Sequence, residues 1–521
     1  METVVPERPS RVSEYVSRAL LLLVLVVNVP AFLCMGLDPD VSQWDLDTRT
    51  VLEGRVLYRD CAENNLPGML VPLAVVRSLF GWRSEVLRLA DLLIVIVICW
   101  QLGRWLPSTA TRTQRLGLVG LLLAFYLSTS EWCHCQRDVW MMAPALAALS
   151  LRCRQVDRLS SVHPSFVTIS AMAFVEGLLW AAAFWITPFI AVPALACWLL
   201  SARMAWSGSR RIVLVDGAAI LAGGVTAGAA GIVWLIATGA WPAFVEVMFV
   251  WNREYVVHDV TQGQYALCVA GLAYRFFPWI LVHLVAVPVA FGAIRRGDVT
   301  QTLLAGMYLG WLVQSVCLQH LFDYVHTPPV LLGLTVAASW CVSLDRLPTR
   351  RMVAVLFLLA VFVRFPALCL DRVTVWGDCL RQGSTATLRD RLTLLPKTNW
   401  ADLARVKDFL REQEIQHGEL SCMDMPTISL YTELGVRPAT RFHFLHNFVA
   451  ALPRQRGVIY AELAASDQRF MLCDSESPSR ERLSEDMTER VVFRAGRYVV
   501  MRLSGPETPE WIEAQFRNIH R

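Results

Sequence analysis

The chain has 521 residues, of which 55% are hydrophobic and 18% are charged, with a formal net charge of +4 and 14 cysteines. Ordinary globular domains are about 25% charged, so this composition excludes a disordered, collagen-like or coiled-coil protein. The small net charge argues against a nucleic-acid-binding protein, and the cysteines are too sparse for a disulfide scaffold. Because the apolar residues are concentrated before residue 370, we expect a polytopic membrane protein with a soluble tail.

Eleven apolar runs have about the length that a helix needs to cross a bilayer. They lie near residues 18–36, 85–103, 116–130, 138–152, 166–184, 186–202, 212–236, 276–294, 300–318, 328–343 and 351–369. A further apolar run, 66–80, lies between Pro67 and Gly81 and contains Arg77; we interpret it as an interfacial helix. The sequence therefore predicts an all-α polytopic membrane domain of about 11 transmembrane helices over residues 1–370.

Arginine clusters recur in every second loop between these runs, and they begin before the first run. They are Arg8, Arg11 and Arg18; Arg104, Arg112 and Arg115; Arg152, Arg154 and Arg158; Arg203, Arg210 and Arg211; Arg295 and Arg296; and Arg346, Arg350 and Arg351. Cytoplasmic loops are enriched in arginine and lysine. We therefore expect a cytoplasmic N-terminus, outer loops at 37–84, 131–137, 237–275 and 319–327, and an extracytoplasmic tail. The first run lacks a small-residue cleavage site, so we do not interpret it as a signal peptide.

The tail alternates helical and strand-like patterns. The helical patterns lie at 401–413, 426–435 and 445–464, and the strand-like runs at 419–423, 440–445 and 468–473. A last pair of runs, 490–494 and 497–503, flanks Ala495-Gly496 as in a hairpin. We expect a soluble extracytoplasmic α/β domain over 399–521, joined to the membrane domain by a polar linker at 371–398.

Polar residues gather in the predicted outer loops, where they are informative in a membrane protein. The first outer loop contains four acids within ten residues: Asp38, Asp40, Asp45 and Asp47. Asp40 and Asp47 would share a face if this segment is helical, because they are seven residues apart. The alternative interpretation is a solvated acidic loop.

The second outer loop contains Cys133, His134 and Cys135, directly followed by Gln136, Arg137 and Asp138. Two thiols and one imidazole leave a zinc site incomplete, and no second cysteine pair has a matching spacing, so we expect no metal. Asp138 also suits the N-terminus of a helix. The later outer loops contribute Arg253 and the series His320, Asp323 and His326, whose spacing places the three on roughly one helical face. Packing histidines are the alternative interpretation there.

An acid beside a cluster of arginines and histidines at an outer membrane surface suits transfer of a sugar from a lipid-linked donor. The carboxylate would take the proton of an acceptor hydroxyl. The cations would stabilise the charge on the departing lipid phosphate.

The outer-loop motifs resemble those of the GT-C superfamily of polyprenyl-phosphate-sugar glycosyltransferases. This superfamily includes the protein O-mannosyltransferases and the lipid A aminoarabinose transferase. The matching residues of the first loop are Gly54, Tyr58, Asp60, Asn65 and Pro67, and those of the second are Gln136, Arg137 and Asp138. The resemblance covers residues 1–370 in layout, and the placement of the tail also agrees.

The resemblance implies an inverting glycosyltransferase that needs neither a metal nor a cofactor. It would move a hexosyl or pentosyl group from a polyprenyl-phosphate donor to a hydroxyl of a lipid, glycan or protein, on the outer face of a bacterial cytoplasmic membrane. The base would be Asp40, which has Trp44 and Gly54 at the family's spacing. Because Val41 stands where the family has Glu, Asp45 and Asp47 remain candidates.

A second departure is Thr187, which stands where many relatives have a lysine. Binding of the donor phosphate would then fall to Arg137, Arg253, Arg275, His320 or His326, among which Arg253 and His326 rank highest. Tyr58, Asn65, Gln136 and Asp138 are further expected substrate-binding residues. Two alternatives remain open. One is a transporter or flippase of lipid-linked sugars, although transporters usually show internal repeats. The other is a non-catalytic GT-C-like protein in which Val41 and Thr187 mark a degraded motif.

Overall fold

The computed structural model describes residues 11–159, 165–206, 210–254, 265–319, 322–343, 370–395, 398–476 and 490–503. The chain divides by its internal contacts into two units. Unit 1 comprises residues 1–33, 88–229 and 264–383, and unit 2 comprises residues 34–87, 230–263 and 384–521. Unit 2 therefore combines the segment after the first apolar helix with the tail.

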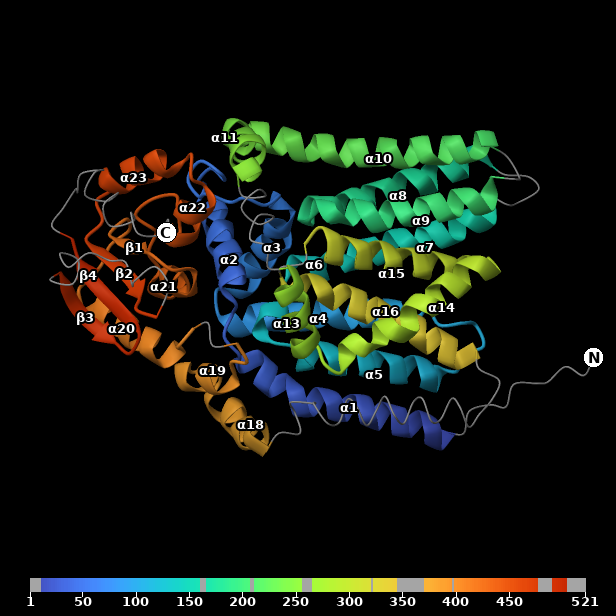
Figure 1. Ribbon diagram of the computed structural model, residues 1–521, viewed down its shortest axis with the longest axis horizontal. Coiled ribbons are helices and arrows are strands. Elements are labelled where there is room, and N and C mark those ends of the chain that lie inside the picture. Colours follow the sequence, from blue (N-terminus) through green and yellow to red (C-terminus); the bar gives the residue numbers. More distant parts are fainter. Residues whose placement is uncertain are drawn as a thin grey trace, which may run out of the picture. The chain divides into compact units, whose positions relative to one another are not determined.

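Unit 1 is helical over its described residues, and Figure 1 shows its long helices lying side by side. The α-helices are α1 (Arg11–Cys34), α4 (Ser84–Gly103), α5 (Arg112–Ser128), α6 (Arg137–Trp140), α7 (Met142–Leu159), α8 (Phe166–Ile186), α9 (Ala191–Ala205), α10 (Arg210–Ala237), α13 (Tyr265–Arg275), α14 (Val282–Arg296), α15 (Val299–Cys317), α16 (Thr327–Ser343) and α18 (Leu370–Gln382). Short 3₁₀ turns are η2 (Glu131–Cys133), η3 (Pro188–Ile190), η5 (Trp279–Leu281) and η6 (Asp323–His326).

The described helices are those of a multi-pass membrane protein. Six segments are long and apolar enough to cross a bilayer: Ser84–Gly103, Phe166–Ile186, Pro188–Ala205, Arg210–Ala237, Trp279–Arg296 and Asp323–Ser343. A seventh is added if α1 and the helix after it count as one broken span. A helix lies near ten of the eleven predicted runs, and the eleventh, 351–369, lies outside the described residues. The run at 66–80 is helical but shorter than a span.

Helices α8 and α10 approach each other at glycines. A Cβ atom on Gly223 would lie 2.1 Å from the carbonyl oxygen of Phe174, and one on Gly177 would lie 2.1 Å from that of Ile220. Small residues allow such close approach of helices in membranes. Gly177 and Gly223 therefore allow α8 and α10 to pack closely.

Three charged side chains of unit 1 meet inside the helix bundle. Arg152 on α7 bonds to Glu176 on α8 at 2.6 Å and to Asp216 on α10 at 2.7 Å, and all three are buried. The sequence analysis assigned Arg152 to a cytoplasmic loop. The loop placement is wrong, because α7 continues to Leu159 and Arg152 lies within this helix beside two acids. The cytoplasmic side of this end of α7 stays a prediction.

Unit 2 contains short helices and one sheet. Its α-helices are α2 (Pro39–Leu52), α3 (Leu70–Phe80), α11 (Trp241–Glu246), α19 (Ala386–Leu392), α20 (Trp400–Glu412), α21 (Ser429–Leu434), α22 (Leu445–Ala451) and α23 (Arg456–Ala464). The turns η1 (Pro67–Met69) and η8 (Met425–Thr427) precede α3 and α21, and η4 (Val247–Trp251) is a π-helical turn. The strands are β1 (Leu420–Cys422), β2 (Phe470–Asp474), β3 (Val491–Ala495) and β4 (Tyr498–Arg502).

The four strands form one sheet in the order β1-β2-β4-β3. β1 runs parallel to β2, and β4 pairs antiparallel with both β2 and β3. The hairpin predicted around Ala495-Gly496 is confirmed, and Gly496 takes a φ of +53° that suits glycine in a tight turn. Phe409 of α20 stacks on Phe493 with ring centroids 4.4 Å apart, which joins this helix to the sheet. The strand predicted at 440–445 is wrong, because this segment is irregular and leads into α22.

The polar stretch 371–398 includes α18 and α19. Cys422 and Cys473 are both buried, and no disulfide joins them.

Candidate active site

Helix α2 carries the three acids that the sequence proposed as bases. Asp38 caps this helix, because its carboxylate accepts a hydrogen bond from the backbone N–H of Asp40 at 3.0 Å. Pro39 stands at the first helical turn, and both features favour a helix start here. α2 packs against α3 and α21, so the solvated-loop alternative is wrong. Asp45 and Asp47 are buried, whereas Asp40 is partly exposed.

Asp45 is fully engaged by Arg77 of α3. The two carboxylate oxygens accept hydrogen bonds from Nε and Nη2 of Arg77 at 2.6 and 2.7 Å, and both side chains are buried. Arg77 Nη1 also donates to the carbonyl oxygens of Gly81 and Arg83. The sequence took this arginine as a sign of an interfacial helix. In the structure it anchors α3 to α2 from inside unit 2.

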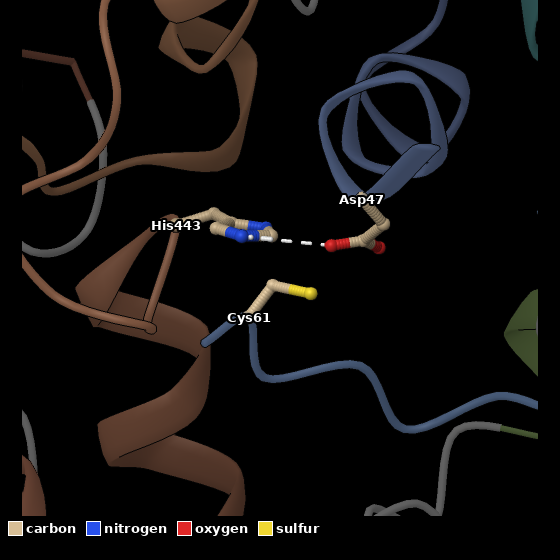
Figure 2. A group of neighbouring side chains, drawn as sticks. All are labelled: Asp47, Cys61 and His443. Carbon is tan, nitrogen blue, oxygen red and sulfur yellow. Dashed lines mark ion pairs between the residues drawn. The ribbon is translucent and has the colours of Figure 1, made fainter. Parts of the chain in front are cut away.

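Asp47 faces a cysteine and a histidine from distant parts of the chain (Figure 2). Its Oδ1 lies 3.5 Å from Nε2 of His443, which belongs to the tail, and Cys61 lies beside both. One side-chain donor atom from each residue lies within 4.8 Å of the other two, and all three residues are buried. Sequence analysis missed Cys61 and His443, because nothing in their spacing relates them to Asp47.

The matched first-loop motif forms a hydrogen-bonded network next to this group. Tyr58 donates its hydroxyl proton to the carbonyl oxygen of Asn65 at 2.8 Å. The backbone N–H and side-chain amide of Asn65 both donate to Glu63 Oε1, and Gln43 of α2 donates to Glu63 Oε2 at 3.1 Å. Tyr58 has a φ of +66°, so its backbone is strained. The motif residues Tyr58 and Asn65 therefore shape this loop and link it to α2.

The burial of this group shifts its protonation. Burial, reinforced by Glu63, raises the pKa of the Asp47 carboxyl well above its usual range. Burial likewise raises the pKa of the Cys61 thiol, with Asp47 adding to the effect. Burial lowers the pKa of His443 to about 3, and Arg55 contributes to that shift. A neutral imidazole has a lone pair available to a hydrogen-bond donor or a metal ion.

Arg253 lies on the surface of unit 2, directly after the π-helical turn η4. Its neighbour Asn252 donates to the carbonyl oxygen of Asn64 at 3.0 Å, which ties this turn to the first-loop motif. Trp251 stacks on Phe442 with ring centroids 6.0 Å apart. The exposed Arg253 therefore follows a turn that is held by contacts of Trp251 and Asn252.

Two polar cavities lie in unit 2. One has a volume of about 270 Å³ and is lined by residues that include Asp45, Arg83, Glu85, Arg389 and Glu433. The other, about 410 Å³, is lined by Arg55, Arg59, Asp60, Pro438, Ala439, Thr440, Arg441 and Glu462. Hydrogen bonding to Arg59 lowers the pKa of Asp60, so this motif acid is held ionised among arginines. Neither of these two cavities is lined by Asp40.

The remaining predicted site residues belong to unit 1. Gln136 and Asp138 are fully buried, and Arg137 pairs with Asp138 at 3.6 Å from Nε to Oδ2. The short helix α6, which contains this pair, contacts η6, which ends at the buried His326. The structure therefore brings the second and fourth outer loops together.

The fourth outer loop is only partly as expected. His320 lies outside the described residues, so its place on a common helical face with Asp323 and His326 stays a prediction. Both oxygens of Asp323 accept hydrogen bonds from Arg275 at 2.6 Å. Thr187 is buried at the end of α8.

Sequence comparisons and structure comparisons give different results. No protein-family model and no curated protein sequence matches the chain. Among solved structures, ArnT from Cupriavidus metallidurans in the apo state is similar over 95% of this chain and 98% of its own, with a TM-score of 0.52 and 14% identity. The same protein bound to undecaprenyl phosphate gives a TM-score of 0.51 over 95% and 99% of the two chains, at 14% identity.

An oligosaccharyltransferase from Archaeoglobus fulgidus, tethered to an acceptor peptide, is more distant. It has a TM-score of 0.47 and 10% identity, and the match covers 89% of this chain and 69% of that one. The likeness to ArnT extends over nearly the full length of both chains. The protein therefore shares its overall fold with ArnT.

Proposed function

We propose that the protein is a membrane glycosyltransferase that moves a sugar from a polyprenyl-phosphate donor to an acceptor hydroxyl. The observation that carries the proposal is a GT-C fold in which the matched first-loop motif forms one partly buried hydrogen-bonded network that reaches α2 through Gln43. The match to ArnT bound to undecaprenyl phosphate supports the choice of a lipid-phosphate donor. The acceptor is a hydroxyl of a lipid, a glycan or a protein.

Asp40 is the proposed general base. Among the three candidate acids of α2, Asp45 is engaged by Arg77 through both oxygens, and Asp47 is buried beside Cys61 and His443. Asp40 is the partly exposed member, so it is the one that an acceptor can approach. A general base must reach the proton that it takes, within hydrogen-bond distance.

The reaction is a direct displacement. Asp40 takes the proton of the acceptor hydroxyl as the acceptor oxygen bonds to the anomeric carbon. The bond from that carbon to the phosphate oxygen breaks, and polyprenyl phosphate leaves with the electron pair. The configuration of the sugar is inverted, and no cofactor enters these steps.

The exposed Arg253 is the proposed principal contact for the donor phosphate in unit 2. Arg137 and His326 are proposed contacts from unit 1, where their two loops meet. Arginine suits this task because its planar guanidinium offers several donors to phosphate oxygens. Gln136 and Asp138 in unit 1, and Tyr58 and Asn65 in unit 2, stay predicted substrate-binding residues, as does His320.

The site is proposed to face the outer side of a bacterial cytoplasmic membrane. The arginine clusters at 104–115, 203–211 and 295–296 support this orientation, with the N-terminus in the cytoplasm. The tail would then lie outside, close to the membrane surface where lipid-linked sugars are consumed.

The experiment uses the full chain, purified and reconstituted into lipid vesicles. A panel of radiolabelled polyprenyl-phosphate sugars is presented with an extract of cell-envelope lipids and glycans as acceptors. We expect labelled product together with free polyprenyl phosphate, both of which disappear in Asp40→Asn. Asp408→Asn is the matched control, because Asp408 is a solvent-exposed acid of α20, and it retains activity.

Movement of intact labelled donor across the vesicle membrane, without release of polyprenyl phosphate, would instead identify a flippase. Neither transfer nor movement with any donor of the panel would identify a non-catalytic protein. Both outcomes contradict the proposed transfer.

A further inference from the structure

A carboxylate, a thiol and an imidazole converge inside unit 2 without any role in the proposed transfer. They are Asp47 of α2, Cys61 of the following loop and His443 of the tail (Figure 2). The three residues are 0–1% exposed. Residues 47 and 443 are separated by most of the chain, so this group is a tertiary contact rather than a local turn.

The donor atoms have the spacing of a metal site. Zinc binds thiolate sulfur at about 2.3 Å and imidazole nitrogen or carboxylate oxygen at about 2.0–2.2 Å, so ligand atoms in a tetrahedral site lie about 3.3–3.6 Å apart. The 3.5 Å between His443 Nε2 and Asp47 Oδ1 already has that value. All three donors lie within 4.8 Å of one another, so shifts of about 1 Å or less would close the site.

The hydrogen bonding of the group is incomplete. By geometry, neither the two oxygens of Asp47 nor Nδ1 of His443 have a hydrogen-bond partner among the described residues, although the Asp47 carboxyl lies near Glu63 and Cys61. Such buried atoms are costly unless something satisfies them. Glu63 lies close enough for its charge to act on Asp47, which adds negative charge to the group.

From this geometry we infer that Asp47, Cys61 and His443 bind one zinc ion. A thiolate and an imidazole favour zinc over magnesium or calcium, which prefer oxygen ligands alone. The ion would neutralise the buried acids and satisfy the carboxylate. The fourth ligand of a tetrahedral site would be a water molecule or, after a side-chain shift, Glu63.

The zinc site is a positioning site and not a catalytic one. Its ligands are buried, and they join α2 and the first-loop motif to the tail. Cys61 is two residues before Glu63, which receives hydrogen bonds from Asn65 and Gln43. A metal at Cys61 would therefore fix the motif loop against α2. This inference does not depend on the proposed transfer, because metal binding is measured without a substrate.

The experiment measures zinc in the full chain, purified in detergent from zinc-supplemented cells. We expect about one zinc per chain by mass spectrometry of the metal content. Zinc falls to background in Cys61→Ser and in His443→Gln. Two controls retain it: Cys422→Ser, because Cys422 is a buried free cysteine on β1, and His446→Gln, because His446 lies three residues from His443.

A second measurement covers the case in which the variants fail to fold. The wild-type chain is stripped with a chelator and titrated with Co²⁺, whose bond to a thiolate produces a near-ultraviolet charge-transfer band. We expect that band in the wild type and in Cys422→Ser, and a lower unfolding temperature after stripping. Wild-type protein that binds neither zinc nor cobalt, or variants of Cys61 and His443 that keep the full zinc content, would overturn the inference.

Discussion

Replacement of Arg77 by methionine tests the internal anchoring of α2. This substitution removes two hydrogen bonds to the buried Asp45 and two to the carbonyl oxygens of Gly81 and Arg83. Breaking one side of a buried ion pair costs about 3–5 kcal/mol, because the other charge stays buried without a partner. Because two hydrogen bonds to carbonyl oxygens are lost as well, we expect the decrease in the free energy of unfolding to lie at the upper end of that range. For a folding unit of roughly 200 residues this corresponds to a decrease of about 10 °C in the unfolding temperature.

The assay is thermal unfolding of the full chain in detergent, followed by loss of the monodisperse peak on size exclusion. Arg83→Met is the matched control: the side chain of Arg83 is largely exposed and pairs with Glu85, so its loss should change the free energy of unfolding by about 0.5 kcal/mol or less. Arg77→Met combined with Asp45→Leu should recover most of the loss, because an apolar pair replaces the orphaned carboxylate. An Arg77→Met protein as stable as the Arg83→Met control, or a double variant no better than the single one, would refute this reasoning.

Three further predictions concern the donor, the tail and the motif loop. Arg253→Ala and His326→Ala should each raise the dissociation constant for undecaprenyl phosphate about tenfold, since each removes a charge-assisted contact worth about 1.4 kcal/mol. Arg405→Ala is the control. An unchanged dissociation constant in both variants would refute phosphate binding by these side chains. Burial opposes ionisation of Glu433, but Arg389 and Lys407 outweigh it and lower the pKa of this carboxyl. The ionised Glu433 therefore stabilises the folded protein above about pH 4.5, and this contribution is lost as the pH falls further. Glu433→Gln should therefore be about 1 kcal/mol less stable than wild type at pH 7 and equal to it in acid; a difference that stays constant across pH would contradict this. Tyr58→Phe removes the hydroxyl that donates a hydrogen bond to the carbonyl oxygen of Asn65. This substitution should lower the unfolding temperature by a few degrees, equivalent to about 1 kcal/mol. An unchanged unfolding temperature would contradict a role for this hydrogen bond in the fold.

The helices of unit 1 could be predicted because each span must satisfy its own backbone in lipid, so it appears as a long apolar run. The hairpin at Ala495-Gly496 could be predicted because a tight turn needs a residue that tolerates positive φ. The segment 440–445 has apolar alternation as well, yet it is irregular. Strand formation depends on a partner strand, and the chain before this segment makes an isolated bridge to β1, between Pro438 and Leu420, that does not extend into 440–445.

The site was harder to predict, because its contacts join distant residues. Acids in the first outer loop and the motif at Tyr58 and Asn65 were visible in the sequence. That Arg77 pairs with Asp45, and that His443 meets Asp47, follows from how the tail and α3 pack on α2. No periodicity in the sequence relates residues 47 and 443. The recurrence of arginine clusters in every second loop could not distinguish the buried Arg152 from arginines that lie in loops.

The most direct test of the central claim compares catalysis and donor binding in the Asp40→Asn variant. If Asp40 takes the proton of the acceptor, the rate of polyprenyl phosphate release should fall by about 10²–10⁴, while the dissociation constant for the donor lipid stays within about twofold of wild type. Release within a few-fold of the wild-type rate would contradict the account, because a chemical step without its base cannot proceed at that rate.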